Sequence, residues 1–308
     1  MLRAAHAAKD AGLQSMRSPA GGKLLRSVLF SPGASEKRMA KAASLACDGV
    51  ILDLEDSVAP DAKVQAREAV GRILASQDFG DKTVVVRVNA LNTEWGRRDV
   101  AAVVEWGRVD AIAVPKVECA EDVHDIERSM RRAGGGSSSL PIWAFVETAK
   151  GIIGAPQIAE CEQVTALAVG CNDLTRDLGA RFTPDRAPLL YSLSAAVVAA
   201  RAGGVVCLDG VPAKVWPSEE ELAAECAQAR DLGFDGKTLI HPGTIAAANA
   251  AFCPTDEEVD FATRVVEAAS RARESGEGMC IVDGLLIEEL HVDHARRLIE
   301  VHAAAQRA

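Results

Sequence analysis

Two carboxylates follow neighbouring apolar runs in the middle of the chain and could together hold a metal ion. The run 142–146 ends at Glu147, and the run 164–169 is followed by Gly170 and then Asp173. Both runs have strand character. Because parallel strands present their C-terminal ends on one face, the two side chains would converge there. Such a pair suits Mg²⁺, with Mn²⁺ as an alternative. The competing interpretation is that both acids cap helices or occupy their first turns.

Polar side chains also stand at the ends of the other strands that the pattern predicts. They are Asp53, Glu55 and Asp56 after the second strand, Arg87 and Asn89 after the third, Lys116 after the fourth, Asp209 after the seventh and His241 after the eighth. Seven consecutive strands with polar ends predict a polar site at one mouth of the fold. This pattern favours the metal-binding interpretation.

From about residue 25 the chain alternates strands with helices. Strands are predicted over 26–30, 49–54, 83–88, 110–114, 142–146, 164–169, 205–208 and 237–240. Helices are predicted over 35–46, 61–75, 95–106, 120–132, 189–202 and 218–232, and also after Glu147, Asp173 and Pro242. Eight strand–helix units in about 225 residues have the length and rhythm of a (β/α)₈ TIM barrel. A doubly wound sheet is the alternative.

Three segments are expected in the chain. Residues 1–24 predict a disordered leader, with a transit peptide as the alternative. Residues 25–254 form the barrel, in which the Gly/Ser run 134–139 predicts a flexible linker. Residues 255–308 form a C-terminal helical extension, with helices over 257–274 and from about Val292. The extension could pack on its own barrel or reach a neighbouring subunit.

Composition narrows the class of protein. The 308 residues are 48% hydrophobic and 25% charged, with a net charge of −10, which argues against general nucleic-acid binding. No apolar run approaches the roughly 18 residues needed to span a bilayer. The eight cysteines are scattered without a CxxC motif, so we expect reduced thiols in a cytoplasmic protein without membrane or nucleic-acid partners.

Seven motifs, in this order, resemble one known family. They are LFSPG (29–33), LDLEDSVAPDAK (52–63), VRVNAL (86–91), VPKVE (114–118), VETAKGI (146–152), GCNDLTRDLG (170–179) and LGFDGKTLIHP (232–242). The chain is similar to the citrate lyase β-subunit-like proteins, which belong with the malyl-CoA lyases to the HpcH/HpaI aldolase group. The resemblance implies a Mg²⁺-dependent (β/α)₈ barrel, assembled as a homotrimer or homohexamer, that makes or cleaves 3-hydroxyacyl-CoA thioesters.

The resemblance also implies roles for individual residues. Glu147 and Asp173 match the metal ligands, and Arg87 matches an arginine on the substrate carbonyl. Expected substrate contacts are Phe30, Ser31, Lys41, Arg87, Glu147, Asn172, Ile240 and His241. Asp53, Glu55 and Asp56 match an acidic cluster under the metal, with Asp56 also a catalytic candidate, and Lys116 is expected to orient acids rather than to form a Schiff base.

Two positions depart from the malyl-CoA lyase pattern. A tail carboxylate of that family, which enters the next subunit's site as acid/base, aligns here with Glu288, whose side chain is one methylene longer than Asp. Asp283 is the alternative. A basic position near CoA is Ser35 here, which leaves phosphate recognition to other residues.

The expected function is a Claisen or retro-Claisen lyase acting on malyl-, citramalyl- or citryl-CoA, with glyoxylate, pyruvate or oxaloacetate as the keto acid. Four alternatives stay open: a malyl-CoA-type thioesterase, an aldolase without CoA, a citrate lyase β subunit that uses an acyl-carrier-protein thioester, and an inactive scaffold. Pocket shape around Phe30, Ala90, Cys171 and Val211 is expected to select the substrate.

Overall fold

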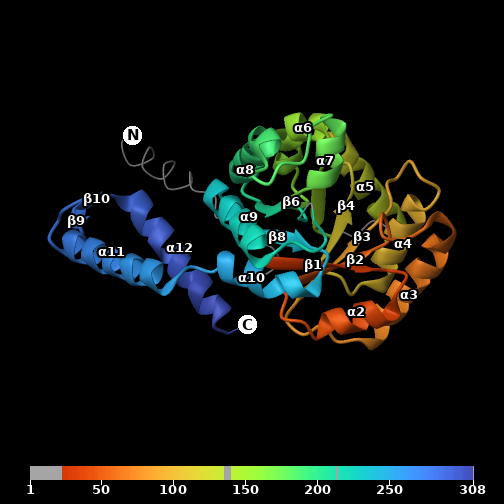
Figure 1. The fold of residues 1–308 in the computed structure, drawn as a ribbon, viewed down its shortest axis with the longest axis horizontal. Helices are drawn as coiled ribbons and strands as arrows, with labels where there is room; N and C mark the ends of the chain where they lie inside the picture. Colours follow the sequence, from red (N-terminus) through yellow and green to blue (C-terminus); the bar gives the residue numbers. More distant parts are fainter. Residues whose placement is uncertain (1–22, 135–139, 213, 308) are drawn as a thin grey trace, which may run out of the picture. The chain divides into compact units, whose positions relative to one another are not determined.

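The computed structural model describes residues 23–134, 140–212 and 214–307, and its first part is a closed parallel barrel (Figure 1). Eight strands follow one another around the barrel in chain order: β1 (Ser27–Pro32), β2 (Gly49–Asp53), β3 (Thr83–Arg87), β4 (Ala111–Val114), β5 (Ile142–Val146), β6 (Val164–Val169), β7 (Val206–Asp209) and β8 (Gly236–Leu239). Pairing of β1 with both β2 and β8 closes the ring. The predicted TIM barrel is confirmed. The predicted leader falls almost entirely outside the described residues, as does most of the predicted Gly/Ser linker.

Helices surround the barrel (Figure 1). They are α2 (Glu36–Ala43), α3 (Lys63–Ser76), α4 (Gly96–Trp106), α5 (Ala120–Ala133), α6 (Ala149–Glu160), α7 (Cys171–Asp177), α8 (Leu190–Gly203) and α9 (Glu219–Leu232), with α10 (Ile245–Ala251) after β8 and 3₁₀ turns over Pro60–Ala62, Ala187–Leu189 and Pro242–Thr244. Both faces of each strand are therefore covered, which explains why the strands read as nearly continuous apolar runs.

Side chains from the strands β1 to β7 fill the barrel interior. Trp143 and Phe145 of β5 are the largest, and both are almost fully buried. Small residues such as Ala113, Ala166 and Ala168 face the same core and leave space for these rings. The interior is thus packed rather than open, so a ligand can be accommodated only at the mouth of the barrel.

The first helix is shorter than predicted. It ends at Ala43 instead of about residue 46, because Ser44 turns the chain: its backbone N–H and its hydroxyl both donate to the carbonyl of Lys41. Its other end is fixed by Ser35, whose hydroxyl accepts from the N–H of Arg38. Arg38 and Lys41, three residues apart, therefore lie on one side of α2.

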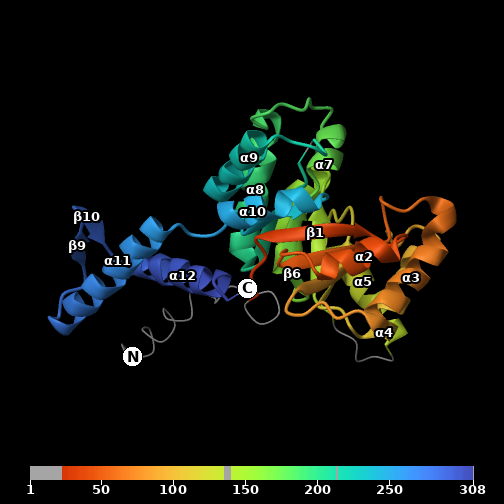
Figure 2. The same ribbon diagram turned by 60° about the horizontal axis from the view of Figure 1, so that its bottom comes forward.

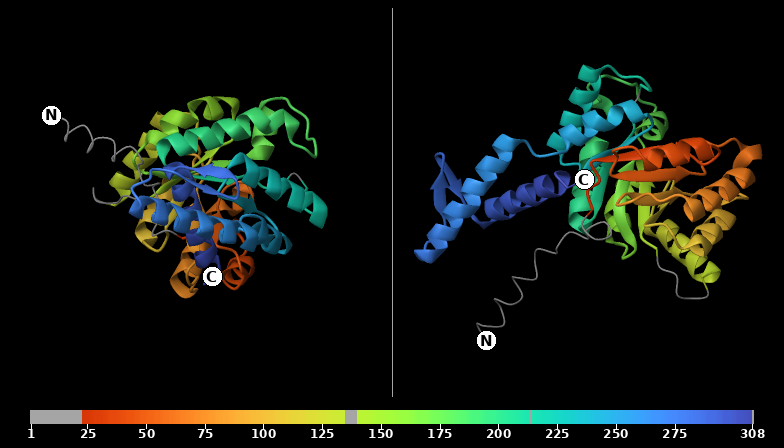
Figure 3. Two further views of the ribbon diagram at one scale, coloured as in Figure 1. Left: turned by 90° about the vertical axis from the view of Figure 1, so that its left-hand side faces the viewer. Right: turned by 90° about the horizontal axis from the view of Figure 1, so that it is seen from below.

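A second compact unit begins at Ala250, within α10. It consists of α11 (Asp256–Glu274), an antiparallel hairpin of β9 (Cys280–Val282) and β10 (Leu285–Ile287), and α12 (Glu289–Ala305). The helices lie side by side, and the hairpin joins their ends (Figures 2 and 3). Asp283 and Gly284 make the hairpin turn with positive φ angles of 51° and 80°, as an Asp-Gly turn requires. The helix predicted from about Val292 begins earlier, at Glu289.

No helix within the described ranges combines the length and apolarity needed to cross a membrane. All eight cysteines lie in these ranges, and each is a free thiol. The expectation of unpaired cysteines is met.

Candidate active site

A cavity of about 750 Å³ lies at the C-terminal mouth of the barrel, formed by residues of the first unit. It brings together most of the residues singled out from the sequence. Its wall includes Phe30, Ser31, Lys41, Asp53, Asp56, Arg87, Glu147, Asn172, Asp173, Ile240 and His241, together with Cys171 and Val211. The polar strand ends predicted a polar site at this mouth, and the polar residues in the cavity wall are found there.

Glu147 is a buried carboxylate that faces the cavity from the end of β5, with only 2% of its surface exposed. The backbone N–H of Lys116 donates to its Oε1 at 2.9 Å. Burial raises the pKa of Glu147 to about 7, with Arg87 lowering it and the neighbouring Asp173 raising it. Gly170 leaves room for the carboxylate, since a Cβ at that position would lie 2.2 Å from Oε2.

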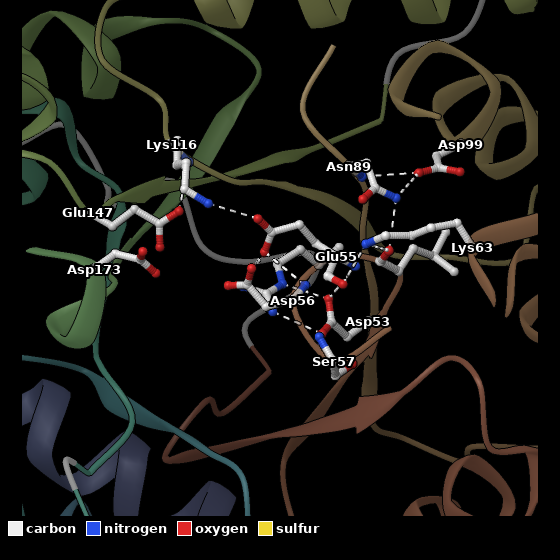
Figure 4. A network of polar contacts seen from close by, with 12 residues as sticks. Asp53, Glu55, Asp56, Ser57, Lys63, Asn89, Asp99, Lys116, Glu147 and Asp173 are labelled. Carbon is white, nitrogen blue, oxygen red and sulfur yellow. Dashed lines mark hydrogen bonds and ion pairs between the residues drawn. The ribbon is translucent and has the colours of Figure 1, made fainter. Parts of the chain in front are cut away.

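Asp173 faces Glu147 from the first turn of α7 (Figure 4). Its carboxylate also pairs with Arg176, whose side chain is largely exposed. The helix-cap alternative fails for Glu147, because the cap of α6 is Thr148, whose hydroxyl accepts from Gly151 N–H at 3.0 Å. Asp173 does lie in the first turn of a helix, as the alternative interpretation predicted, and from that position its carboxylate also faces Glu147.

Arg87 is held by carboxylates at the end of β3. Its Nε and Nη2 donate to the two oxygens of Asp53 at 2.7 and 2.9 Å, and its Nη1 lies 3.1 Å from Glu55 and 3.8 Å from Asp56. Its guanidinium carbon lies 4.7 Å from the centroid of the Phe30 ring. Burial alone would lower the pKa of Arg87, but Asp53 and its neighbours raise it above the ordinary value. Arg87 therefore pairs with the acids and also lines the cavity, and its contact with a substrate carbonyl stays a prediction.

Lys116 links this acidic cluster to Glu147 (Figure 4). Its Nζ donates to Glu55 Oε1 at 2.9 Å, while its backbone N–H reaches Glu147 as described above. The residue has a φ of +52°, an uncommon conformation for a side chain of this size that is often found at functional sites. Glu55 and Lys116 are not part of the cavity wall, and their supporting role stays a prediction. We call Asp53, Glu55, Asp56, Arg87 and Lys116 the pocket cluster.

Asp209 and Asn89 do not join the site, contrary to the expectation from their positions at strand ends. Asp209 is fully buried, and it accepts from Lys237 Nζ at 2.6 Å and from Arg186 Nη1 at 2.8 Å. Asn89 donates through Nδ2 to Asp99 and to the carbonyl of Leu54. Ala90, expected to shape the pocket, is not part of the cavity wall. Some polar residues at strand ends therefore line the cavity, whereas others, such as Asp209 and Asn89, bind to other parts of the barrel.

The cavity wall also includes residues that the sequence pattern missed. Arg38 stands one turn before Lys41 on α2, and that spacing was the one available signal. Trp216 lies in the loop before α9, where no periodicity marks it. Its ring centroid lies 4.1 Å from that of His241, and the two ring planes are tilted by 60°. The hydroxyl of Ser31 is buried and has no hydrogen-bond partner among the described residues, so it is available to a ligand.

The two tail acids belong to the second unit. Glu288 is exposed just before α12, and its backbone N–H donates to His291 Nδ1 at 3.0 Å. This contact closes the first turn of α12 and explains its earlier start. Asp283 pairs instead with Arg264 at 2.7 Å in the hairpin turn.

Comparison with known proteins agrees with this geometry. Residues 26–242 match the family described as HpcH/HpaI aldolase/citrate lyase. The chain belongs to this family. It is 42% identical over 274 residues to a (3S)-malyl-CoA thioesterase of Cereibacter sphaeroides, covering 89% of this chain and 93% of that one. It is 36% identical to the citrate lyase subunit beta of Escherichia coli, covering 89% and 92%.

A solved structure supports the same assignment. The CitE protein of Mycobacterium tuberculosis, in complex with magnesium, acetoacetate and coenzyme A, superposes with a TM-score of 0.73 at 29% identity, covering 90% of this chain and 97% of that chain. The family is thus one of CoA-ester lyases and citrate lyase β subunits, and a related structure contains Mg²⁺.

The residues of this chain fit a Mg²⁺ ion. Within the described ranges no group of three or more His, Cys, Asp and Glu side chains is placed to hold a metal. Glu147 and Asp173, which face each other at the cavity wall, supply two carboxylates that would hold the ion. Mg²⁺ tolerates this, because it usually keeps several waters and uses one or two carboxylates. The raised pKa of Glu147 shows that its buried carboxylate lacks enough positive charge nearby to stabilise the ionised form. A bound cation would supply that charge.

Proposed function

We propose that the protein is a Mg²⁺-dependent lyase that cleaves or forms the carbon–carbon bond of a 3-hydroxyacyl-CoA of the malyl type. The observation that carries the proposal is the meeting of Glu147 and Asp173 with Arg87 in one cavity at the barrel mouth. The magnesium, acetoacetate and coenzyme A bound to the related CitE protein support the same ligand classes. Glyoxylate, pyruvate and oxaloacetate are the candidate keto acids.

The chemistry assigns a distinct task to each group. In cleavage the 3-hydroxyl loses its proton, the C2–C3 bond breaks, and its electron pair forms the enolate of the shortened acyl-CoA. Mg²⁺ held by Glu147 and Asp173 would act as a Lewis acid towards substrate oxygens. Arg87, fixed by Asp53, stabilises negative charge on oxygen as the bond breaks. Asp56 lines the cavity with 58% of its side chain exposed, so it is available to accept the hydroxyl proton.

The enolate then requires a proton at carbon, and we propose that Glu288 of a neighbouring subunit donates it. Glu288 is exposed and lies beside the exposed apolar residues Ile281, Leu285, Leu286 and Leu290 of the hairpin and α12. Exposed apolar side chains grouped in this way are typical of a surface that contacts another protein. A homotrimer or homohexamer would bury them and complete the site.

Thioester hydrolysis is the second candidate function, because the (3S)-malyl-CoA thioesterase is 42% identical over nearly the whole chain. The same carboxylates and Arg87 would then serve attack of water on the thioester carbonyl. This reaction releases a dicarboxylate and free CoA thiol, whereas the lyase releases a keto acid and keeps the thioester.

Assays of both products in one reaction separate these functions. Purified protein with Mg²⁺ is given malyl-, citramalyl- and citryl-CoA, and keto acid and free thiol are measured together. The lyase predicts keto acid without thiol, lost on adding EDTA. Thiol without keto acid would establish the thioesterase instead, and no product from any thioester would contradict both.

We also propose the cytoplasm as the location. All eight cysteines are unpaired thiols, which is the usual state in a reducing compartment. Fractionation of cells that produce the full chain tests this proposal.

A further inference from the structure

The loop of residues 54–58, which follows β2, carries the group to which we assign the first proton transfer. We call it the acidic loop. Its Asp56 lines the cavity. Within the loop, the backbone N–H groups of Glu55 and Ser57 donate to the two oxygens of Asp53, at 2.9 and 3.1 Å. The position of Asp56 therefore depends on how the backbone of the acidic loop is held.

Lys63, the first residue of α3, binds the backbone of the acidic loop. Its Nζ donates to the carbonyl of Leu54 at 2.9 Å and to the carbonyl of Glu55 at 2.7 Å. The side chain is buried and is not part of the cavity wall. Figure 4 shows it on the other side of the acidic loop from Glu147 and Asp173. Lys63 therefore supports the loop from behind and does not face the cavity.

The buried ammonium of Lys63 has no carboxylate partner among the described residues. Besides the two carbonyls it contacts the ring of Trp95, whose centroid lies 5.6 Å from Nζ. Burial lowers the pKa of Lys63, while the charges of Glu55 and Asp53 raise it. Lysine is almost never buried without an ionic partner, because the loss of hydration costs free energy. A lysine in this position is therefore expected to have a specific task.

Hydrogen-bond satisfaction alone does not explain Lys63, because each carbonyl that it binds already has another donor. Asn89 Nδ2 donates to the first carbonyl at 2.8 Å, and the N–H of Val58 donates to the second at 3.0 Å. Lys63 adds a geometric restraint instead. One nitrogen binds two successive carbonyls and so fixes the peptide units on both sides of Glu55, the second of which leads directly into Asp56.

Asn89, the second side chain that supports the acidic loop, is itself held in place. Its backbone N–H and its Nδ2 both donate to Asp99 Oδ2, at 3.1 and 2.6 Å. The other oxygen of the fully buried Asp99 accepts from Arg67 Nε at 2.6 Å. Arg67 and Lys63 are four residues apart and therefore lie on the same face of α3. The acidic loop is thus supported by α3 and α4, and none of these four residues lines the cavity.

We propose that Lys63 is a positioning residue, which together with Asn89 holds the acidic loop so that the Asp56 carboxylate faces the substrate. This inference rests on the proposed function, in which Asp56 accepts the proton of the 3-hydroxyl. Asp56 needs such support, because its side chain is 58% exposed and lies 3.8 Å from its cationic neighbour Arg87. A displacement of about 1 Å can slow a reaction about 10²-fold.

The first experiment measures amide hydrogen exchange of the full chain without substrate. We expect Lys63→Met, which keeps the length of the side chain, to speed exchange of the Ser57 and Val58 amides about tenfold or more. Arg72→Met is the matched control, since Arg72 is an exposed cation of the same helix, and it should leave exchange of the acidic loop unchanged. Unchanged exchange in Lys63→Met would overturn the proposal. Faster exchange spread evenly over the barrel strands would also overturn it, because it would show a general loss of stability.

The second experiment measures turnover of malyl-CoA with Mg²⁺ by Lys63→Met, by Asp56→Asn and by the double variant. We expect Lys63→Met to lower kcat about tenfold or more while KM changes less than about twofold. In the Asp56→Asn background the same change should have little further effect, because Lys63 acts through Asp56. Asn89→Leu should repeat this pattern with a smaller loss of kcat.

Equal fold losses in both backgrounds would show that Lys63 does not act through Asp56, and would overturn the proposal. The hydrogen-exchange measurement separates this failure from a failure of the proposed function. If malyl-CoA gives no product while Lys63→Met still speeds exchange in the acidic loop alone, the proposed reaction fails and the support of the loop by Lys63 stands.

Discussion

Two charged clusters each include an aspartate at the C-terminal end of a barrel strand, Asp53 of β2 in one and Asp209 of β7 in the other, and only the first lines the cavity. The β7–β8 cluster consists of Arg186, Asp209, Glu225 and Lys237. Lys237 Nζ donates to Asp209, to Glu225 and to the carbonyl of Gly210, all at 2.6–2.7 Å, so its three protons are used. Arg186 donates to both oxygens of Asp209. Each charge in this cluster has a partner.

The pocket cluster and the neighbouring Glu147 differ from the β7–β8 cluster, because not every buried charge among them has a partner of opposite sign. Asp53 is satisfied by Arg87, but Glu147 pairs with no Lys or Arg side chain among the described residues. The pKa directions record this difference. Burial would raise the pKa of Asp209, yet Lys237 and Arg186 hold it below its ordinary value, whereas burial raises the pKa of Glu147 to about 7. In a balanced buried cluster each charge depends on its partner, so that removal of one member destabilises the fold, whereas an unbalanced buried charge indicates a ligand site.

The largest difference between an effect on turnover and an effect on stability is expected from Glu147→Gln. Loss of a metal ligand should lower Mg²⁺-dependent turnover by about 10³-fold, because charge stabilisation worth several kcal/mol is removed. Stability in EDTA should be unchanged or higher, since the variant no longer buries an unpaired carboxylate. Steady-state kinetics and thermal unfolding of the same preparation measure both quantities. Retained turnover would show that Glu147 does not hold the metal.

Asp209→Asn should have the opposite pattern. Removing one member of a buried ion pair leaves Lys237 and Arg186 uncompensated, which should lower the free energy of unfolding by about 3–5 kcal/mol. Turnover per folded molecule should change little, because Asp209 does not line the cavity. Urea unfolding checks the first value. An unchanged midpoint would mean that the β7–β8 cluster adds no stability.

Gly170→Ala tests the space around Glu147. The added Cβ would lie 2.2 Å from Glu147 Oε2 and must displace the carboxylate, so turnover should fall by about 10²-fold. Gly278→Ala is the matched control, because its Cβ would meet nothing within 4 Å. Equal activity of both variants would show that the Glu147 position is not critical.

Lys116→Met tests the link between the pocket cluster and the metal ligands. The variant keeps the backbone N–H to Glu147 but loses the Nζ contact to Glu55, and about a tenfold fall in turnover is expected. Lys150→Met, which removes an exposed lysine paired with Glu118, should leave kcat/KM unchanged. A normal rate for Lys116→Met would limit the role of Lys116 to its backbone.

The smallest effect is expected in the pH dependence of stability in EDTA. Asp209 and Glu147 should change the free energy of unfolding in opposite directions as the pH rises. The lowered pKa of Asp209 contributes stability above its unfolded pKa of about 4, which is lost as the pH falls further. The raised pKa of Glu147 acts in reverse, because its stability is present below 4.5 and is lost as the pH rises to about 7. Glu147→Gln should therefore remove the decline between pH 5 and 7 and keep the acid-side loss. The same pH profile for both proteins would contradict this assignment.

The sequence was sufficient for the architecture and for the strand ends at the centre of the site. The strands 142–146 and 164–169 have the predicted bounds, because short apolar runs ended by polar residues have few alternatives. Helix ends were less predictable. The end of α2 depends on the Ser44 hydroxyl and the start of α12 on the His291 ring, and neither contact is visible in a hydrophobic pattern.

The chemistry of each strand end was harder to predict than its position. Asp209 looks the same as Asp53 in the sequence, yet its partners Arg186 and Lys237 lie in segments that meet it only in the folded barrel. Trp216 lies in an irregular loop, so only the fold brings it to His241. The spacing of polar residues in the sequence therefore locates the site, but the ion pairs that form in the folded barrel determine which of these residues belong to it.

Direct measurement of Mg²⁺ binding tests the central claim. Equilibrium titration of the metal-free full chain should show one Mg²⁺ per chain in the unchanged protein and in Glu225→Gln, a change confined to the β7–β8 cluster. Glu147→Gln and Asp173→Asn should lose this binding while staying folded. An unchanged protein that binds no Mg²⁺, or a Glu147→Gln variant that binds it normally, would contradict the account.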